Sequence, residues 1–198
     1  MGLPLYIYLP NYYADNFDIT LQNIALILFA TRLIDTVQDP IFGLISDKYS
    51  HLKRKIIFYL SPLMGFSFLL LFHPLDFLNI HLWLIIFLII TFSLFSAIYI
   101  NYQSYSVNFS RDYHVKTKII AYREIAFISG IIFAALIPSV LFKIFDEVTS
   151  FLIIGFIYFI LTIVFSLIFY FFAPKNIHQI KQKPNFKEKF TKKNIIKF

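Results

Sequence analysis

Three ionisable residues, Arg32, Asp35 and Asp39, lie within one otherwise apolar stretch of the chain. An ionisable side chain near the middle of a membrane costs about 2.5–3.5 kcal/mol on insertion scales, so three of them in one spanning helix need a reason. Spacings of three and four residues place them along one helix face, where Arg32 can neutralise a carboxylate and both carboxylates can point into one cavity. Gln38 lies beside them. This anionic, oxygen-rich face suits a hard monovalent cation or a proton.

The same residues could instead form a structural ion-pair lattice that only fixes helix packing. We favour a transport site, because charged residues that are costly within a membrane usually have a function there.

Polar and aromatic residues also gather toward the end of a later apolar stretch. Tyr99, Tyr102 and Gln103 are spaced so that they can line a wet cavity that recognises hydroxyl-rich solutes. For Tyr102 and Tyr105, an aromatic belt at the membrane interface is the alternative. Arg123, at the start of the next stretch, either extends toward the interface or faces a transport pathway.

The composition indicates a membrane protein. Of 198 residues, 59% are hydrophobic, 20% are aromatic and 15% are charged, and the mean hydropathy is +0.71. The absence of cysteine excludes a disulfide framework and a thiolate metal site. The five histidines show no paired ligand spacing, so we expect no transition-metal site. We also find no nucleophile with a base partner and no phosphate loop, so we do not expect an enzyme.

Apolar runs of about 20 residues predict helices that cross a membrane. Five runs are full length or nearly so, at residues 24–45, 56–72, 80–100, 125–145 and 149–173. A shorter run at residues 3–13 ends at a polar turn of residues 14–18 and covers about half of the hydrocarbon layer, so the first helix looks truncated. We therefore predict an all-α integral membrane protein with a six-segment bundle at residues 1–174 and a basic cytoplasmic segment at residues 175–198.

The charge distribution predicts the orientation. The net charge is +7, and most lysines and arginines lie in residues 48–55, 111–123 and 175–197. The intervening connections carry the acidic residues Asp15, Asp18, Asp76, Asp146 and Glu147. Because short cytoplasmic loops carry the basic excess, this alternation places both termini in the cytoplasm. The positive charge is thereby explained without a nucleic-acid partner.

A set of costly residues at fixed spacing suggests a family. The set runs over one helix and its end and comprises Arg32, Asp35, Asp39, Pro40, Gly43, Ser46, Asp47 and Lys48. It resembles the second helix of the glycoside-pentoside-hexuronide:cation symporters, the melibiose-permease-like branch of the major facilitator superfamily. The resemblance implies that Asp35 and Asp39 bind the coupling Na⁺, Li⁺ or proton with help from Gln38, which stands where the family more often has Asn.

The resemblance extends to later helices. It implies an oxygen ligand for the cation near Ser96, while Tyr99 stands where the family has a sugar-binding Asp, and Arg123 matches an Arg of the fifth helix. We accordingly expect a solute pathway formed by Arg32, Tyr99, Gln103 and Arg123. We expect a cytoplasmic gating motif formed by Gly43, Asp47, Lys48 and Arg54.

Only the first half of the family pattern is covered, since members have two six-helix bundles with the solute site between them. Residues 11–15 look like the outer end of helix I, and residues 184–198 look like the central loop before helix VII. We therefore expect a half-transporter or fragment in the inner membrane that moves a small solute, a sugar or glycoside, with Na⁺ or H⁺ and no other cofactor. Its partner would be a separately encoded C-terminal half or a second copy. The alternative is a non-transporting remnant or membrane scaffold of a split transporter gene.

Overall fold

The computed structural model of the chain describes residues 2–75, 78–107 and 112–174. Within these residues the chain forms helices and no strand. The helices are α1 (Gly2–Phe17), α2 (Leu21–Lys48), the 3-10 turn η1 (Ser50–Leu52), α3 (Lys53–Leu71), α4 (Ile80–Val107), α5 (Tyr113–Leu141) and α6 (Glu147–Phe172). The predicted basic segment at 175–198, Asp76 and Arg111 lie outside the described residues.

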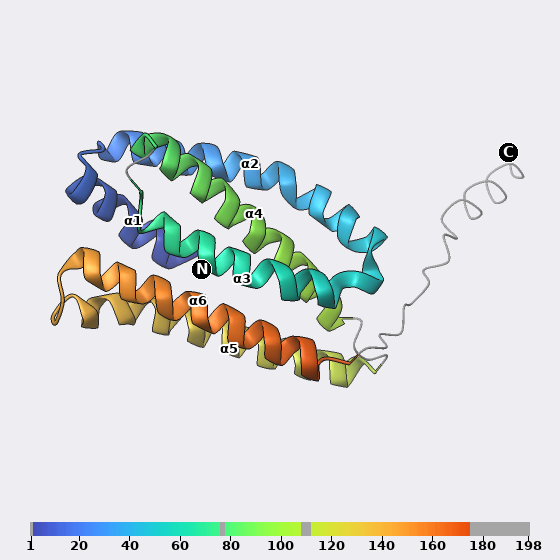
Figure 1. Cartoon of the computed structure of the whole chain (residues 1–198). Coiled ribbons are helices and arrows are strands. Elements are labelled where there is room, and N and C mark those ends of the chain that lie inside the picture. Colours follow the sequence, from blue (N-terminus) through green and yellow to red (C-terminus); the bar gives the residue numbers. More distant parts are fainter. Residues whose placement is uncertain (1, 76–77, 108–111, 175–198) are drawn as a thin grey trace, which may run out of the picture.

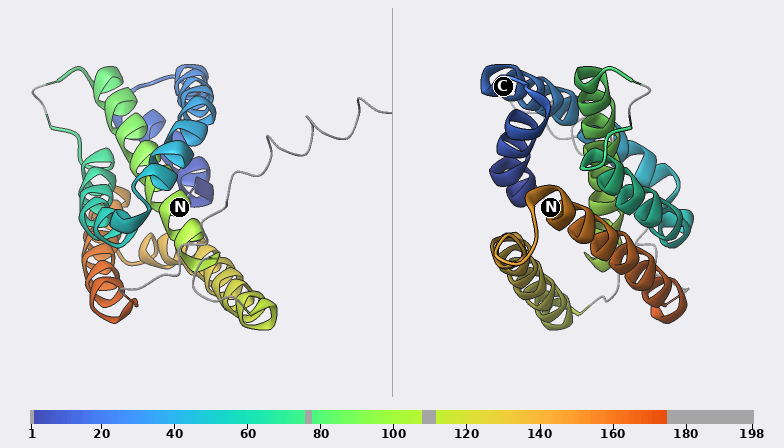
Figure 2. Two further views of the ribbon diagram at one scale, coloured as in Figure 1. Left: turned by 90° about the vertical axis from the view of Figure 1, so that its right-hand side faces the viewer. Right: turned by 60° about the vertical axis from the view of Figure 1, so that its left-hand side comes forward.

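The helices lie side by side as an elongated bundle (Figure 1). The most extensive packing joins α3 to α6, α3 to α4 and α2 to α4, whereas α5 touches its neighbours at few places. Figure 2 shows the same bundle from two further directions, with α4 running between α3 and α2. The central pair α3 and α4 therefore carries most of the interhelical contact.

Polar caps begin three of the helices. The side chain of Thr20 accepts a hydrogen bond from the backbone N–H of Asn23 at the start of α2, and Asp112 accepts one from His114 at the start of α5. Asp146 accepts from both the backbone N–H and the hydroxyl of Thr149, at 3.0 and 2.9 Å. These bonds satisfy N–H groups that have no partner within a helix.

The exposed Asp146 cap also has an electrostatic consequence. The hydrogen bonds from the backbone N–H and the hydroxyl of Thr149 hold the pKa of the Asp146 carboxyl below its ordinary value of 3.8. The cap therefore stays ionised, with its negative charge at the N-terminus of α6, where the helix dipole favours it.

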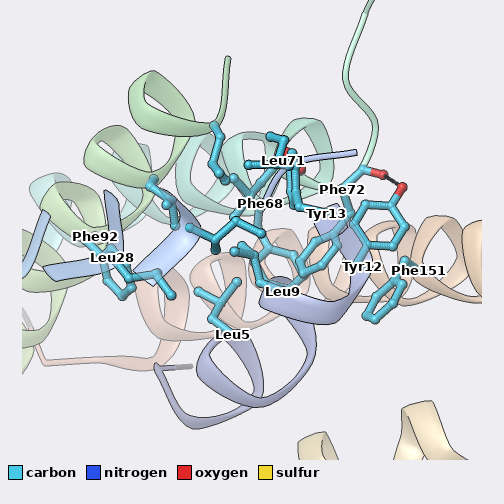
Figure 3. Close-up of a cluster of buried hydrophobic side chains, with 14 residues drawn as sticks. Leu5, Leu9, Tyr12, Tyr13, Leu28, Phe68, Leu71, Phe72, Phe92 and Phe151 are labelled. Carbon is cyan, nitrogen blue, oxygen red and sulfur yellow. Dashed lines mark hydrogen bonds between the residues drawn. The ribbon is translucent and has the colours of Figure 1, made fainter. Parts of the chain in front are cut away.

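An aromatic cluster fastens α1 to the bundle (Figure 3). Tyr12 and Tyr13 are fully buried, and their hydroxyls donate to the carbonyls of Phe72 and Leu71 at 2.8 and 2.5 Å. The ring of Phe151 stacks on Phe72 with centroids 4.7 Å apart. Because the last carbonyls of a helix lack intrahelical partners, the two tyrosines complete the end of α3 while they dock α1.

Two glycines allow α3 and α6 to approach closely. A Cβ atom on Gly65 would clash with Thr162 Oγ1 and would lie 3.1 Å from Phe159 Cα. A Cβ atom on Gly155 would lie 2.9 Å from Leu69 Cδ1. Small residues at such contacts are the usual means of close helix packing in membranes.

The contact between α3 and α4 includes the indole of Trp83. This side chain is buried, and its Nε1–H donates to the carbonyl of Leu70 at 2.9 Å. Its ring lies 4.3 Å from that of Phe87. Deeper in the same contact, the hydroxyls of Ser67 and Thr91 share a hydrogen bond of 2.7 Å.

The helix ends differ from the predicted spans because polar residues continue the helices past the apolar runs. The predicted polar turn at residues 14–18 is wrong in part, since α1 runs to Phe17 and the Asn16 amide donates to the carbonyl of Tyr12. α4 ends at Val107 rather than at residue 100, and α5 runs from Tyr113 to Leu141 rather than over residues 125–145. Side chains in the added turns bond to their own helix, as Ser106 does to the carbonyl of Gln103, which offsets their polarity.

In the described part of the chain, four helical stretches are long and apolar enough to cross a membrane. They are Ser50–Leu71, Ile80–Ser106, Tyr113–Leu141 and Glu147–Phe172. α1 is shorter, with 16 residues, and α2 is made less apolar by its charged residues. The predicted spans at residues 3–13 and 24–45 thus correspond to helices, although α1 is shorter and α2 less apolar than the other four.

Basic and acidic connections lie at opposite ends of the bundle. The junction of α2 with α3, the end of α4, the start of α5 and the end of α6 gather at one end (Figure 1). At that end Lys53 donates to Ser104 at 2.6 Å, and Tyr105 donates to the carbonyl of Pro174 at 2.7 Å. Asp15, Asp18 and Asp146 lie at the other end. The alternating charges along the sequence therefore correspond to the two ends of the folded bundle.

Candidate functional site

Two hydrogen bonds join the polar face of α2 to α4. The hydroxyl of Ser96 donates to Asp39 Oδ1, and the hydroxyl of Ser93 donates to Gln38 Oε1 at 2.6 Å. Since Gln38 and Asp39 are neighbours on α2 while Ser93 and Ser96 are one turn apart on α4, the bonds form two adjacent links between the helices. The structure thus brings together three of the predicted cation ligands, Gln38, Asp39 and Ser96.

The fourth predicted ligand, Asp35, pairs with Arg32. Arg32 Nη1 lies 2.9 Å from Asp35 Oδ2, and the side chain of Asp35 is 13% exposed while that of Arg32 is 46% exposed. The Arg32 guanidinium also donates through Nε to the hydroxyl of Tyr6. Its Cζ lies 4.9 Å from the ring centre of Tyr6 and 4.8 Å from that of Phe92. Residues from α1, α2 and α4 therefore hold this arginine in place.

The second carboxylate oxygen of Asp35 has no such partner. Oδ1 is buried and receives no hydrogen bond from any described residue. Asp39 is also near enough to act on Asp35 electrostatically. A buried carboxylate oxygen without a donor costs free energy, and a bound cation or proton removes that cost. The arrangement therefore has the chemistry of a site for a small cation, with Arg32 as its internal counter-charge.

The predicted pathway residues lie further along α4 and on α5. Tyr99 and Gln103 are exposed, and the Tyr99 ring stacks on Phe95 with centroids 5.9 Å apart. Arg123 is 13% exposed and pairs with its neighbour Glu124 at 2.6 Å. Tyr99 and Gln103 continue the α4 face that carries Ser96.

Arg123 also reaches the end of that α4 face, because its Nη1 donates to the hydroxyl of Ser106 at 3.2 Å. The pathway residues therefore extend from the α2–α4 contact toward the basic end of the bundle, but Arg32 and Arg123 do not meet at one point.

Although Gly43, Asp47 and Lys48 lie in the last turns of α2, no side-chain hydrogen bond or ion pair joins the four residues of the predicted gating motif. Arg54 donates to the carbonyl of Ala173 at 3.0 Å and lies over the ring of Tyr170, so it joins α3 to the end of α6. Lys48 lies over the ring of Tyr49, at 5.5 Å. Asp47 is exposed, and a Cβ atom on Gly43 would meet nothing within 4 Å.

Four residues of this region were not predicted. Ser93 could have been found, since it precedes Ser96 by three residues and shares its helix face. Tyr6 and Phe92 could not, because their place around Arg32 depends on how α1 and α4 pack against α2. Lys53 is buried against Ser104, whereas its sequence context is typical of an exposed basic turn.

Among the described residues, no group of three or more His, Asp or Glu side chains could hold a metal ion.

A bundle of long apolar helices that carries a charged pair within one helix is typical of a class of protein, the multi-pass membrane transport proteins. The sequence profile of the MFS/sugar transport protein family matches residues 1–197, and the chain belongs to this family of the major facilitator superfamily. No curated protein and no solved structure matches the chain. The family membership confirms the resemblance that the α2 residues suggested, and it agrees with the predicted all-helical membrane fold. It also indicates a transporter rather than an enzyme.

Proposed function

We propose that the chain is a six-helix half of a cation-coupled symporter that moves a small solute, a sugar or glycoside, together with Na⁺ or H⁺. Membership of the sugar transport family supports the solute class. The cation would bind between α2 and α4, with Asp35, Asp39, Gln38 and Ser96 as ligands.

One observation carries the proposal of cation coupling, namely the buried Asp35 oxygen that lacks a donor. In a purely structural ion-pair lattice, both oxygens of a buried carboxylate are expected to be paired, because an unpaired one destabilises the fold. Here Arg32 pairs with one oxygen and leaves the other free. Hard monovalent cations prefer oxygen ligands, and the neighbouring Asp39 carboxylate, Ser96 hydroxyl and Gln38 amide supply them.

The charges suggest how the cation would couple to transport. Without a cation, Arg32 neutralises only part of the charge of Asp35 and Asp39. Binding of Na⁺ or a proton removes the remaining negative charge and so lowers the cost of closing this face away from water. Solute bound along Tyr99, Gln103 and Arg123 would then favour the closed state. The bundle would rock against a second bundle, so that the site opens to one side of the membrane and then to the other.

The exposed polar residues of α2 favour a partner bundle. Arg32 is half exposed, and Thr36 and Asp39 are exposed at the middle of a helix that is otherwise apolar. Contact with lipid at this depth is unfavourable for such groups. A second bundle, either a C-terminal half or a second copy of the chain, would cover them and enclose the solute. We expect the assembly in the inner membrane with both termini in the cytoplasm.

Carboxyl modification tests the cation site directly. The purified chain in lipid nanodiscs is treated with a carbodiimide in the presence and absence of Na⁺ or Li⁺, and modified residues are mapped by mass spectrometry. We expect the cation to protect Asp35 and Asp39, while the exposed Asp15 is modified equally in both conditions. Equal modification of all three, with no effect of pH on Asp35 and Asp39, would leave the structural ion-pair lattice as the better explanation.

Proteoliposomes test the need for a partner. We expect no cation-driven sugar uptake by a monomeric chain, and uptake when the chain is reconstituted with a second bundle. Uptake by the chain in a strictly monomeric state would contradict the half-transporter proposal.

A further inference from the structure

Two serines of α4 donate hydrogen bonds to neighbouring side chains of α2. Ser96 donates to Asp39, and Ser93, one turn earlier, donates to Gln38 Oε1 at 2.6 Å. The first bond involves two residues already placed in the cation site. The second involves Ser93, which has no ionisable partner and whose role the proposed function does not explain.

The bond from Ser93 determines how the Gln38 amide is oriented. A glutamine amide carries an oxygen at one side and an NH₂ group at the other, and rotation about its last torsion exchanges them. The Ser93 hydroxyl donates to the oxygen, so the oxygen faces α4 and the NH₂ group faces away. Only the oxygen can bind a cation, whereas the NH₂ group carries partial positive charge and repels one.

This bond joins two helices, as do the bonds of Ser96 with Asp39 and of Ser67 with Thr91, whereas many other hydroxyls of the described helices bond within their own helix. Serine and threonine in membrane helices commonly donate to a carbonyl of their own helix. Thr36 does so to Arg32, and Ser129 does so to Ile125, at 2.9 and 2.8 Å. Ser93 instead reaches across to α2, to the residue directly before Asp39.

We propose that Ser93 is a positioning residue that sets the cation preference of the α2–α4 site by holding the Gln38 amide with its oxygen toward α4. The inference rests on the proposed cation site. Na⁺ and Li⁺ need several oxygen ligands, including neutral ones, whereas a proton needs only a carboxylate. Ser93 therefore favours binding of Na⁺ and Li⁺ and has little influence on protonation of Asp35 or Asp39.

The test measures Na⁺ affinity of the full chain in nanodiscs and the competition of protons with Na⁺. Ser93→Ala should raise the Kd for Na⁺ by about 3- to 10-fold, the effect expected for loss of one oriented hydrogen bond, and should leave proton competition unchanged. Ser93→Thr keeps the hydroxyl and should restore the affinity. Ser67→Ala is the matched control, because it removes an interhelical hydroxyl bond between α3 and α4 and should change stability without changing cation preference.

A second measurement separates positioning from general destabilisation. In a Gln38→Leu background, Ser93→Ala should have no further effect on Na⁺ affinity, since the amide on which Ser93 acts is gone. An unchanged Kd in Ser93→Ala, an equal loss in the Gln38→Leu background, or the absence of saturable Na⁺ and Li⁺ binding by the wild-type chain would overturn the inference.

The outcome for Ser93 can be told apart from the outcome for the whole site. If Asp35→Asn abolishes Na⁺ binding while Ser93→Ala leaves it unchanged, the cation site stands and only the role of Ser93 is wrong. If Asp35→Asn binds Na⁺ as the wild type does, the proposed cation site itself is wrong, and the inference about Ser93 fails with it.

Discussion

At the scale of single residues, the central feature is Arg32. Neighbouring side chains hold its guanidinium in place, yet it pairs with only one of the two carboxylate oxygens of Asp35. The rings of Tyr6 and Phe92 and the hydroxyl of Tyr6 hold the Arg32 guanidinium beside Asp35. Cation–π contacts of this kind contribute about 0.5–2 kcal/mol. Arg32 is therefore placed to compete with the transported cation for the carboxylate of Asp35.

Replacement of Arg32 tests this competition. We expect Arg32→Gln to raise Na⁺ affinity by about 2- to 5-fold, because the counter-charge of a partly exposed ion pair is worth up to about 1 kcal/mol. Titration of the chain in nanodiscs with Na⁺ measures the effect. Arg123→Gln is the control, since Arg123 pairs with Glu124 and should leave the affinity unchanged. A weaker affinity in Arg32→Gln would instead mean that Arg32 organises the site.

The sequence predicts this site only in part. The costly residues of α2 are visible because charges stand out in an apolar run, and the resemblance adds Ser96 from another helix. The positions of Tyr6 and Phe92 depend on tertiary packing, and uncharged residues carry no energetic signal in a sequence, whereas Ser93 could have been found from its spacing to Ser96. For Arg54 the sequence suggests a role that the contacts do not reflect. It was assigned to a gating motif, whereas in the structure it bonds to the end of α6.

At the scale of elements, the most extensive interface is that of α3 with α6, where glycines let the backbones approach. The two helices are also joined by aromatic contacts, including one between Phe58 and Tyr170 with centroids 4.6 Å apart. In a membrane such packing is the main source of helix association, because lipid chains are as apolar as the side chains they replace.

Gly65→Ala and Gly155→Ala should each destabilise the bundle. The added methyl group would lie within van der Waals distance of the opposite helix, and overpacking of this kind costs about 1–3 kcal/mol. Unfolding in detergent, followed by circular dichroism, measures the loss. Gly130→Ala on α5 is the control, because its Cβ atom would meet nothing within 4 Å, and it should change stability by less than about 1 kcal/mol. Equal effects of all three would contradict the proposed importance of close α3–α6 contact.

The cap of α6 predicts a dependence on pH. Hydrogen bonds from Thr149 lower the pKa of Asp146 in the folded state, so its stabilising effect is fully present above the ordinary value of 3.8 and is lost as the pH falls through the folded pKa. Asp146→Ala should therefore loosen the first turn of α6 at neutral pH, as seen by faster hydrogen exchange at residues 147–150. The difference from wild type should shrink at low pH. A difference that persists when Asp146 is protonated would show that the cap acts by packing and not by charge.

At the scale of the whole molecule, the bundle separates its charges along its length. The basic connections lie at one end and the acidic ones at the other, with the apolar helices between them (Figure 1). Such a molecule has one favoured orientation in a membrane whose cytoplasmic loops carry the positive charge.

Cysteine labelling tests the orientation, and the absence of cysteine from the chain provides the background. Asp15→Cys, at the acidic end, should react with a membrane-impermeant maleimide in intact cells. His114→Cys, at the basic end, should react only after the membrane is permeabilised. Both residues are exposed, so their accessibility to reagent is comparable. The reverse pattern would overturn the predicted topology.

The fold was more predictable than the site. Apolar runs identify the six α-helices found in the described residues, because each helix needs a long apolar surface to pack or to face lipid. Their ends were less predictable, since α4 and α5 continue through polar residues such as Asn101 and Thr117, which bond to carbonyls of their own helix. The order of packing was not predictable, because helices of nearly uniform hydrophobicity carry no stripe that distinguishes one neighbour from another.

The contact of Trp83 with the end of α3 gives the protein a native optical reporter. The chain contains a single tryptophan, which is buried where α3 meets α4 and donates to the carbonyl of Leu70. Indole emission moves to longer wavelength when the ring meets water, so the emission of the unlabelled wild-type chain follows the separation of these two helices. Any cation or solute that opens or closes the acidic end of the bundle would therefore be visible in the fluorescence of this one residue.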